Sequence, residues 1–214
     1  MATSTWPPSE GLSTPTVALR DALLTLSAST NIKAPAALVL DVLRETLQYK
    51  DWNTWCPDVT FESQPADAPT ADKLNKGTVF TFHVIMEASK PTKTTATRLI
   101  VTDISTPQHP SDYISSTSVD SMKAYTSDLS TVYRISWKGD GGFPGLRSER
   151  FHEIILRGEQ QCEVRTWEVM GGVLARTVKW FYQKTLNEKF ELWCSDLKKR
   201  SEALATQGTA PASN

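Results

Sequence analysis

The sequence predicts an α+β fold in which a long C-terminal helix packs across an antiparallel sheet. Between Val59 and Met170, apolar and polar residues alternate in short runs separated by turn signals, as in half-buried strands. After Gly171 and Gly172, the chain has no proline or glycine up to about Thr206, and its apolar residues recur mainly every three to five positions. A helix of that length must lie across the sheet to bury its apolar stripe.

A strand and two short helices are expected before the main run of strands. Residues 23–32 read as the strand, and Pro35 then stands where the first turn of a helix tolerates proline. The apolar residues that follow recur every three to four positions, as in a helix with one buried face: Ala36, Leu40, Leu43 and Leu47. A second helical piece, residues 48–55, ends before Pro57.

Six further strands complete a predicted sheet of about seven. We expect them at residues 59–63, 78–87, 95–104, 129–138, 146–157 and 162–170. In the second of these, the apolar residues fall on even positions, at Phe80, Phe82, Val84 and Met86. The even face is therefore expected to be buried.

The composition predicts one domain flanked by two tails. Residues 1–15 are rich in Ser, Thr and Pro, and residues 207–214 are small and polar, so we expect both segments to be disordered. The domain then spans residues 16–206. A chain of 214 residues can bury a core and still hold an internal cavity.

Charge and segment patterns exclude several classes of protein. The chain has 23 Lys and Arg against 24 Asp and Glu, a net charge of −1, which argues against a nucleic-acid partner. The longest nearly apolar run, residues 34–40, is too short for a membrane span, and no secretory signal is recognised at the start. The 3 cysteines stand outside any CxxC pattern. We therefore expect a cytoplasmic protein with free thiols.

The order of elements resembles the helix-grip fold of the START-like (SRPBCC) superfamily. That superfamily contains the birch-pollen-allergen type, lipid-transfer START domains, coenzyme Q-binding proteins and aromatic polyketide cyclases. Two stretches are similar to its polyketide cyclase/dehydrase branch: NIKAPAALVLDVLRETLQYKDWNTWCPDV and RSERFHEIILRGEQQCEVRTWEVMGGVLA. The first resembles an I-x-A-P, helix, W-N opening, and the second an E-R-x-H-E strand followed by E-x-x-G-G. The resemblance implies a curved sheet gripping the long helix around a hydrophobic cavity, but no catalytic residue.

The faces of the last two strands supply candidate catalytic residues. The even positions of both strands carry fewer charges, and we place them inward. A three-residue hairpin loop at residues 158–160 would then set Arg150 opposite Glu168 and His152 opposite Thr166. His152 and Glu168 could move a proton while Arg150 stabilises an enolate oxygen. Alternatively, Arg150 and Glu168 are a structural cross-strand pair and His152 is a hydrogen-bonded histidine of the core.

Aromatic residues supply candidate walls for the cavity, because their flat faces pack on ring-containing ligands. The candidate ligand-binding residues are Trp52, Trp55, Phe82, Tyr133, Trp137, Thr166, Phe181 and Trp193. Core packing is the competing role for at least half of the aromatic residues. Lys179 and Lys184 are expected on the solvated face of the last helix.

Other kinds of site are not predicted. His152 and Glu153 lack the second histidine of a zinc HExxH motif, and the histidines are scattered, so no metal site is expected. The glycines of residues 139–145 lie between strands and do not open a helix, so they form no phosphate cradle. We therefore expect no cofactor.

These observations support three functions. The first is a cofactor-independent cyclase, dehydratase or isomerase acting on a hydrophobic, aromatic or polycyclic molecule in secondary metabolism. The second is a non-catalytic carrier or sensor of a lipid or other hydrophobic ligand, using the same cavity. The third is an interaction module of the chaperone-cofactor type, whose cavity would be filled by side chains. A monomer and a homodimer both remain open.

Overall fold

A computed structural model describes residues 6–111, 113–114, 124–141 and 144–209. The strands are β1 (Leu24–Ile32), β2 (Asp58–Ser63), β3 (Val79–Ile85), β4 (Thr94–Ser105), β5 (Val132–Gly139), β6 (Arg147–Gly158) and β7 (Gln161–Gly171). The helices are α1 (Ala36–Arg44) and α3 (Val173–Thr209), with short 3-10 helices η1 (Leu19–Asp21), η2 (Thr46–Asp51) and η3 (Leu129–Thr131). The predicted α+β fold and order of elements are confirmed.

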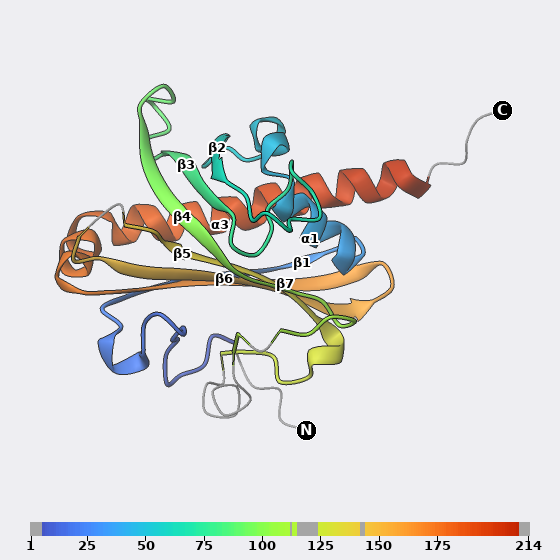
Figure 1. Ribbon diagram of the computed structural model, residues 1–214, viewed down its shortest axis with the longest axis horizontal. Helices are drawn as coiled ribbons and strands as arrows, with labels where there is room; N and C mark the ends of the chain where they lie inside the picture. Colours follow the sequence, from blue (N-terminus) through green and yellow to red (C-terminus); the bar gives the residue numbers. More distant parts are fainter. Residues whose placement is uncertain (1–5, 112, 115–123, 142–143, 210–214) are drawn as a thin grey trace.

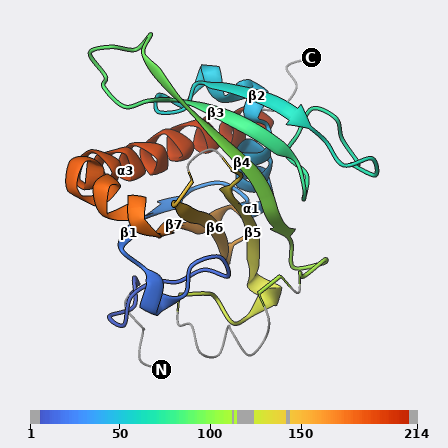
Figure 2. The same ribbon diagram turned by 60° about the vertical axis from the view of Figure 1, so that its left-hand side comes forward.

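One curved antiparallel sheet holds all seven strands, in the order β1-β7-β6-β5-β4-β3-β2. α3 lies along its concave face, and β2, β3 and β4 bend over the helix from one side (Figure 1, Figure 2). α1 packs against α3 and closes part of the same face. The sheet therefore grips the helix, as the helix-grip resemblance implies.

The register between β6 and β7 is the one the sequence predicts. Arg150 pairs with Glu168, and His152 pairs with Thr166. The hairpin reaches this register differently, because its turn is at residues 159–160, Gly158 pairs with Gln161, and an irregularity near Leu156 restores the offset. A bulge thus supplies the residue that the predicted three-residue loop would have held.

The inner face of the sheet and α3 enclose the main core. The largest side chains there belong to residues of η2, of the strands and of α3, including Tyr49, Phe80, Phe190 and Trp193, all fully buried. Aromatic rings meet mostly edge to face, with Phe80 and Phe82 centroids 5.0 Å apart. This aromatic core borders the candidate site.

The outer face of the sheet is also covered, which the sequence did not predict. The N-terminal segment and the chain after β4 lie on this side (Figure 1). Together with outward residues of β6 and β7, these segments build a second core. Its members from the covering segments are Leu12, Val17, Ile114, Ala124 and Tyr125, and its members from the two strands are Phe151, Trp167 and Val169. Residues 6–15 were expected to be disordered, yet Leu12 is only 2% exposed. Packing against Phe151 and Trp167 explains the difference.

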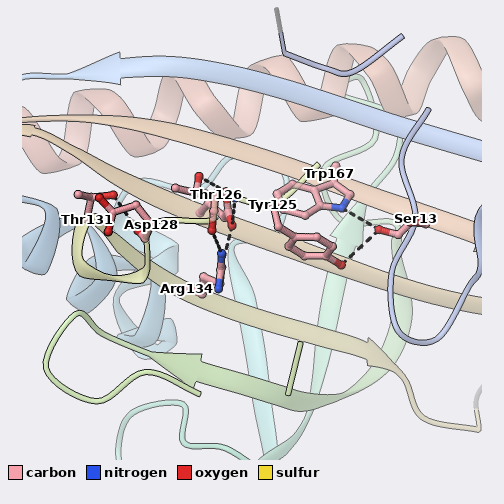
Figure 3. A network of polar contacts seen from close by, with 8 residues as sticks. Ser13, Tyr125, Thr126, Asp128, Thr131, Arg134 and Trp167 are labelled. Carbon is pink, nitrogen blue, oxygen red and sulfur yellow. Dashed lines mark hydrogen bonds and ion pairs between the residues drawn. The ribbon is translucent and has the colours of Figure 1, made fainter. Parts of the chain in front are cut away.

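Hydrogen bonds fasten this outer layer to the sheet. Tyr125 and Trp167 both donate to the carbonyl oxygen of Ser13, at 3.3 and 3.4 Å (Figure 3). Residues 207–209, expected in the C-terminal tail, continue the backbone of α3. The rest of the two predicted tails, residues 1–5 and 210–214, lies outside the described residues. In the described part of the chain, no helix is long and apolar enough to cross a membrane.

Candidate functional site

A cavity of about 140 Å³ lies between the sheet and α3. Its walls come from the segment after η2, from β3 to β7 and from α3. The lining residues are Trp55, Cys56, Phe82, Val84, Met86, Thr95, Thr97, Leu99, Trp137, Arg150, Glu168, Met170 and Leu186. Most of these side chains are apolar, and Arg150 and Glu168 contribute a guanidinium and a carboxyl group. The site therefore combines an apolar wall with two charged groups from adjacent strands.

Arg150 is held in the cavity wall without a described carboxylate partner within ion-pair distance. Its Nε donates to Thr166 Oγ1 at 3.1 Å, while its buried Nη2 has no hydrogen-bond partner. The guanidinium lies 4.1 Å from the ring centroid of Phe190 and 4.5 Å from that of Trp193. Cation–π attraction compensates part of the cost of burying this charge. The free Nη2 can donate to an oxygen atom of a ligand.

Glu168 is the second ionisable group of the cavity. Burial raises the pKa of its carboxyl, while the positive charge of Arg150 and a hydrogen bond from Ser148 act in the opposite direction. The predicted ion pair between Arg150 and Glu168 is not a direct contact, and the two groups attract each other at longer range. A carboxyl with a raised pKa is a stronger base than an ordinary one, and it can also return a proton near neutral pH.

His152 lies beside the cavity but is not one of its lining residues. Its ring is 4.6 Å from that of Trp137 and 5.7 Å from that of Trp193, measured between centroids. Neither ring nitrogen has a hydrogen-bond partner. Burial and then the charge of Arg150 hold the pKa of the imidazole well below its ordinary 6.5. His152 is therefore neutral at physiological pH, and Trp137 and Trp193 pack against it.

The structure separates the other predicted ligand-binding residues into three groups. Trp55, Phe82 and Trp137 line the cavity. Trp52 and Trp193 belong to the aromatic core beside it, with centroids 6.0 Å apart, and Thr166 positions Arg150. Tyr133 packs against the rim of the main core, and Phe181 is on the surface, 68% exposed. The ligand role of all eight stays a prediction.

Several lining residues were not singled out from the sequence. Thr95, Thr97 and Leu99 are alternate positions of β4, and Leu186 belongs to the apolar stripe of α3. Their alternation places them on one face but does not say that this face borders empty space. Cys56 was noted only as a free thiol. Burial raises the pKa of the Cys56 thiol to about 12, so it is protonated and a poor nucleophile at neutral pH.

A larger hollow, of about 390 Å³, lies on the opposite face of the sheet. Its wall includes Asp128, Arg157 and Arg165. Both arginines already bind Glu163, with Arg165 Nε 2.6 Å from the carboxylate. The hollow thus offers no buried unpaired charge to a ligand. Among the described residues, no group of three His, Cys, Asp or Glu side chains could hold a metal ion.

Comparison with known proteins agrees with the fold. No protein-family model matches the chain. A hypothetical protein of Helicobacter pylori superposes with a TM-score of 0.62 at 13% identity, over 94% of this chain and 99% of that one. A START superfamily protein of Mycobacterium smegmatis gives 0.57 at 12% identity, over 84% and 98%. The Zhui aromatase/cyclase of a Streptomyces species gives 0.54 at 11% identity, over 85% and 97%.

One relative is similar in sequence as well. Oxopyrrolidines biosynthesis cluster protein O of Penicillium oxalicum is 30% identical over 201 residues, which cover 87% of this chain and 90% of the fungal protein. Identity over nearly the full length of both chains indicates common descent and a shared fold. The chain belongs to one family with this fungal biosynthesis-cluster protein, and it has the fold of the START superfamily protein and of the aromatase/cyclase.

Proposed function

We propose that the protein binds a hydrophobic, ring-containing small molecule in the cavity and catalyses a cofactor-independent cyclisation, dehydration or isomerisation on it. The observation that carries this proposal is the Arg150 guanidinium, fully buried in an aromatic wall with Nη2 unpartnered. A buried donor without a partner costs free energy, which a ligand oxygen would recover. The aromatase/cyclase neighbour and the biosynthesis-cluster relative support a role in secondary metabolism.

Arg150 and Glu168 divide the proposed chemistry between them. The Glu168 carboxylate removes a proton from the carbon next to a ligand carbonyl. The electron pair of that C–H bond forms a C=C bond to the carbonyl carbon, and the π pair of the carbonyl moves to its oxygen, which gives an enolate. Arg150 Nη2 donates to this oxygen and stabilises its charge in a site of low polarity. The proton then returns from Glu168 to a different carbon in an isomerisation, or to a departing hydroxyl in a dehydration.

His152 remains a second candidate for proton transfer. Its nitrogens are free, but Trp137 and Trp193 pack against its ring, and it does not line the cavity. Direct participation requires that the ligand displace Trp137. We therefore assign the main proton transfer to Glu168, with its raised pKa.

The size of the cavity restricts the ligand. Pockets for drug-sized molecules enclose roughly 300 to 1,000 Å³, well above the 140 Å³ found here. The cavity therefore suits one small ring, or the ring end of a longer molecule whose remainder extends out of the cavity. A lactam ring of the kind named for the fungal relative has a carbonyl oxygen that could accept from Arg150.

A non-catalytic carrier is the second candidate. It is favoured by the position of His152, because the imidazole does not line the cavity and Glu168 is the carboxyl group that does. The open space in the cavity speaks against the interaction module, which requires a cavity filled by side chains.

Arg150→Met is the sharpest test, with Arg157→Met on the exposed part of the same strand as its matched control. Native mass spectrometry of the purified protein first identifies a co-purified ligand. If none is found, a simple lactam serves as the probe. We expect Arg150→Met to weaken binding about tenfold or more, since a hydrogen bond to a charged group is lost, and Arg157→Met to bind normally. Equal affinities for the two variants would contradict the assigned role.

Incubation then separates the enzyme from the carrier. For an enzyme, the wild-type protein changes the mass or absorbance of its bound ligand, and Glu168→Gln stops that change while still binding. Quantitative recovery of unaltered ligand at full occupancy would overturn catalysis and leave the carrier.

A further inference from the structure

The first turns of α3 expose large apolar side chains on the side that faces solvent. Val173 is 79% exposed, Trp180 85% and Phe181 68%. With Thr177 between them, they recur at positions i, i+4, i+7 and i+8, which is the spacing of a single helix face. We call this face, together with Arg176, Lys179 and Lys184, the α3 patch. Figure 2 shows these turns, in orange, on the outside of the molecule.

The charges of the patch have one sign. Arg176, Lys179 and Lys184 are exposed, and none forms an ion pair with a described residue. The first acidic residue of α3 is Glu188, after more than four turns of helix. Farther along, the solvent side of the helix becomes polar, with Glu191, Ser195 and Lys199 exposed. The apolar and basic character is therefore confined to the first part of the helix.

We propose that the α3 patch docks the protein on an anionic membrane surface. Trp and Tyr favour the interface between lipid and water, and cations beside them are attracted to anionic headgroups. Docking would insert Trp180 and Phe181 among the headgroups, with Lys184 beside them. Tyr182 lies one turn before Leu186, a residue of the cavity wall, and is itself 48% exposed.

Area and charge favour a lipid surface over another protein. The patch spans about 20 Å of helix that is about 10 Å wide, far less than the roughly 800 Å² per partner of a stable protein interface. A symmetric dimer through this face would also oppose the three cations of one copy with those of the other. A bilayer needs only a few inserted aromatic side chains and complementary charge.

Vesicle sedimentation tests the proposal with the full chain. The probes are vesicles of phosphatidylcholine alone and vesicles with about 30% phosphatidylserine, at low and at physiological salt. We expect binding to the anionic vesicles that weakens with salt. Trp180→Ser combined with Phe181→Ser should lower the partition constant about tenfold or more, and Lys179→Glu combined with Lys184→Glu should lower it about as much.

Two controls change similar residues outside the patch. Lys199→Glu alters a cation in the second half of α3, and Leu47→Ser removes an exposed apolar side chain from η2. Both should bind vesicles like the wild type, and all variants should keep the wild-type circular dichroism spectrum because the changed residues are exposed. Failure to bind anionic vesicles at low salt, or unchanged binding by the aromatic double variant, would overturn the proposal. A dimer that the same variant abolishes, without vesicle binding, would instead identify a self-association surface.

Discussion

Strand β6 carries buried polar residues on both faces, and the two faces differ in whether these residues are hydrogen-bonded. On the outer face, Glu153 accepts from Arg134 Nε at 2.7 Å and from Thr126 Oγ1 at 2.7 Å. Glu149, also on that face, accepts from Tyr113 Oη at 2.7 Å and from Thr16 N at 2.9 Å. On the inner face, Arg150 keeps an unpartnered Nη2 and His152 has two unpartnered nitrogens.

We interpret this difference as one between burial that stabilises the fold and burial that serves the proposed ligand. A buried polar group that is fully bonded holds elements together, and its loss leaves partners unsatisfied. One that is left unbonded destabilises the fold and is retained where a ligand can satisfy it. The outer face thus fastens the N-terminal segment and the chain after β4, whereas on the inner face Arg150 keeps an unpartnered donor in the wall of the cavity.

Removing one outer-face carboxylate should have the largest effect on stability. Glu153→Ala leaves the Arg134 charge, 2% exposed, without its carboxylate and the Thr126 amide without an acceptor, while Arg134 Nη2 still donates to the carbonyl oxygen of Thr126. We expect the free energy of unfolding, measured in urea, to fall by about 3 to 5 kcal/mol. Glu163→Ala removes ion pairs at the surface and should cost less than about 1 kcal/mol. Equal losses in the two variants would show that the outer network is not a structural fastening.

The inner face should instead make stability depend on pH through His152. Its pKa is lowered in the folded protein, so the unfolded chain binds a proton that the folded one does not as the pH falls below about 6.5. The favourable contribution of this group is complete above that pH, and about 1.4 kcal/mol is lost for each unit below it until the folded pKa is reached.

His152→Phe should remove this loss, because phenylalanine fills the space between Trp137 and Trp193 without a titrating group. Urea denaturation at about pH 5 and about pH 7 measures it. His83→Gln removes an imidazole that hydrogen-bonds Thr60 on the half-exposed side of β3 and is the matched histidine control. If His152→Phe kept the same loss, the slope would belong to another group.

The sequence predicted the inner face of β6 better than the outer one. The pairing of Arg150 with Glu168 follows from the alternation of β6 and β7, which sets the register wherever one face is buried. The same alternation assigned Glu149 and Glu153 to the outer face but could not show that a further layer covers it. Trp6 and Leu12 are isolated apolar residues among Ser, Thr and Pro, so the composition of residues 6–15 gave no sign of packing.

Packing in three dimensions accounts for what was missed at the site. Whether His152 reaches the cavity depends on the rings of Trp137 and Trp193, whose positions no local pattern encodes. Phe181 continues the apolar spacing of α3 but lies on its solvent side and is 68% exposed, whereas Leu186 of the same predicted stripe is 8% exposed. Periodicity identifies a face, and only the tertiary structure shows what that face meets.

Arg150→Met should have the smallest effect on stability, although the charge it removes is fully buried. The substitution loses one hydrogen bond to Thr166 and the cation–π contacts, but it also removes the desolvation cost of a guanidinium that has no carboxylate in direct contact. Because these contributions oppose each other, we expect the free energy of unfolding at neutral pH to stay within about 1 kcal/mol of wild type. A loss as large as that of Glu153→Ala would show that Arg150 is a structural residue, and the two faces of β6 would then not differ in role. The variant should also lessen the pH dependence due to His152, since the positive charge of Arg150 contributes to the lowered pKa of that imidazole.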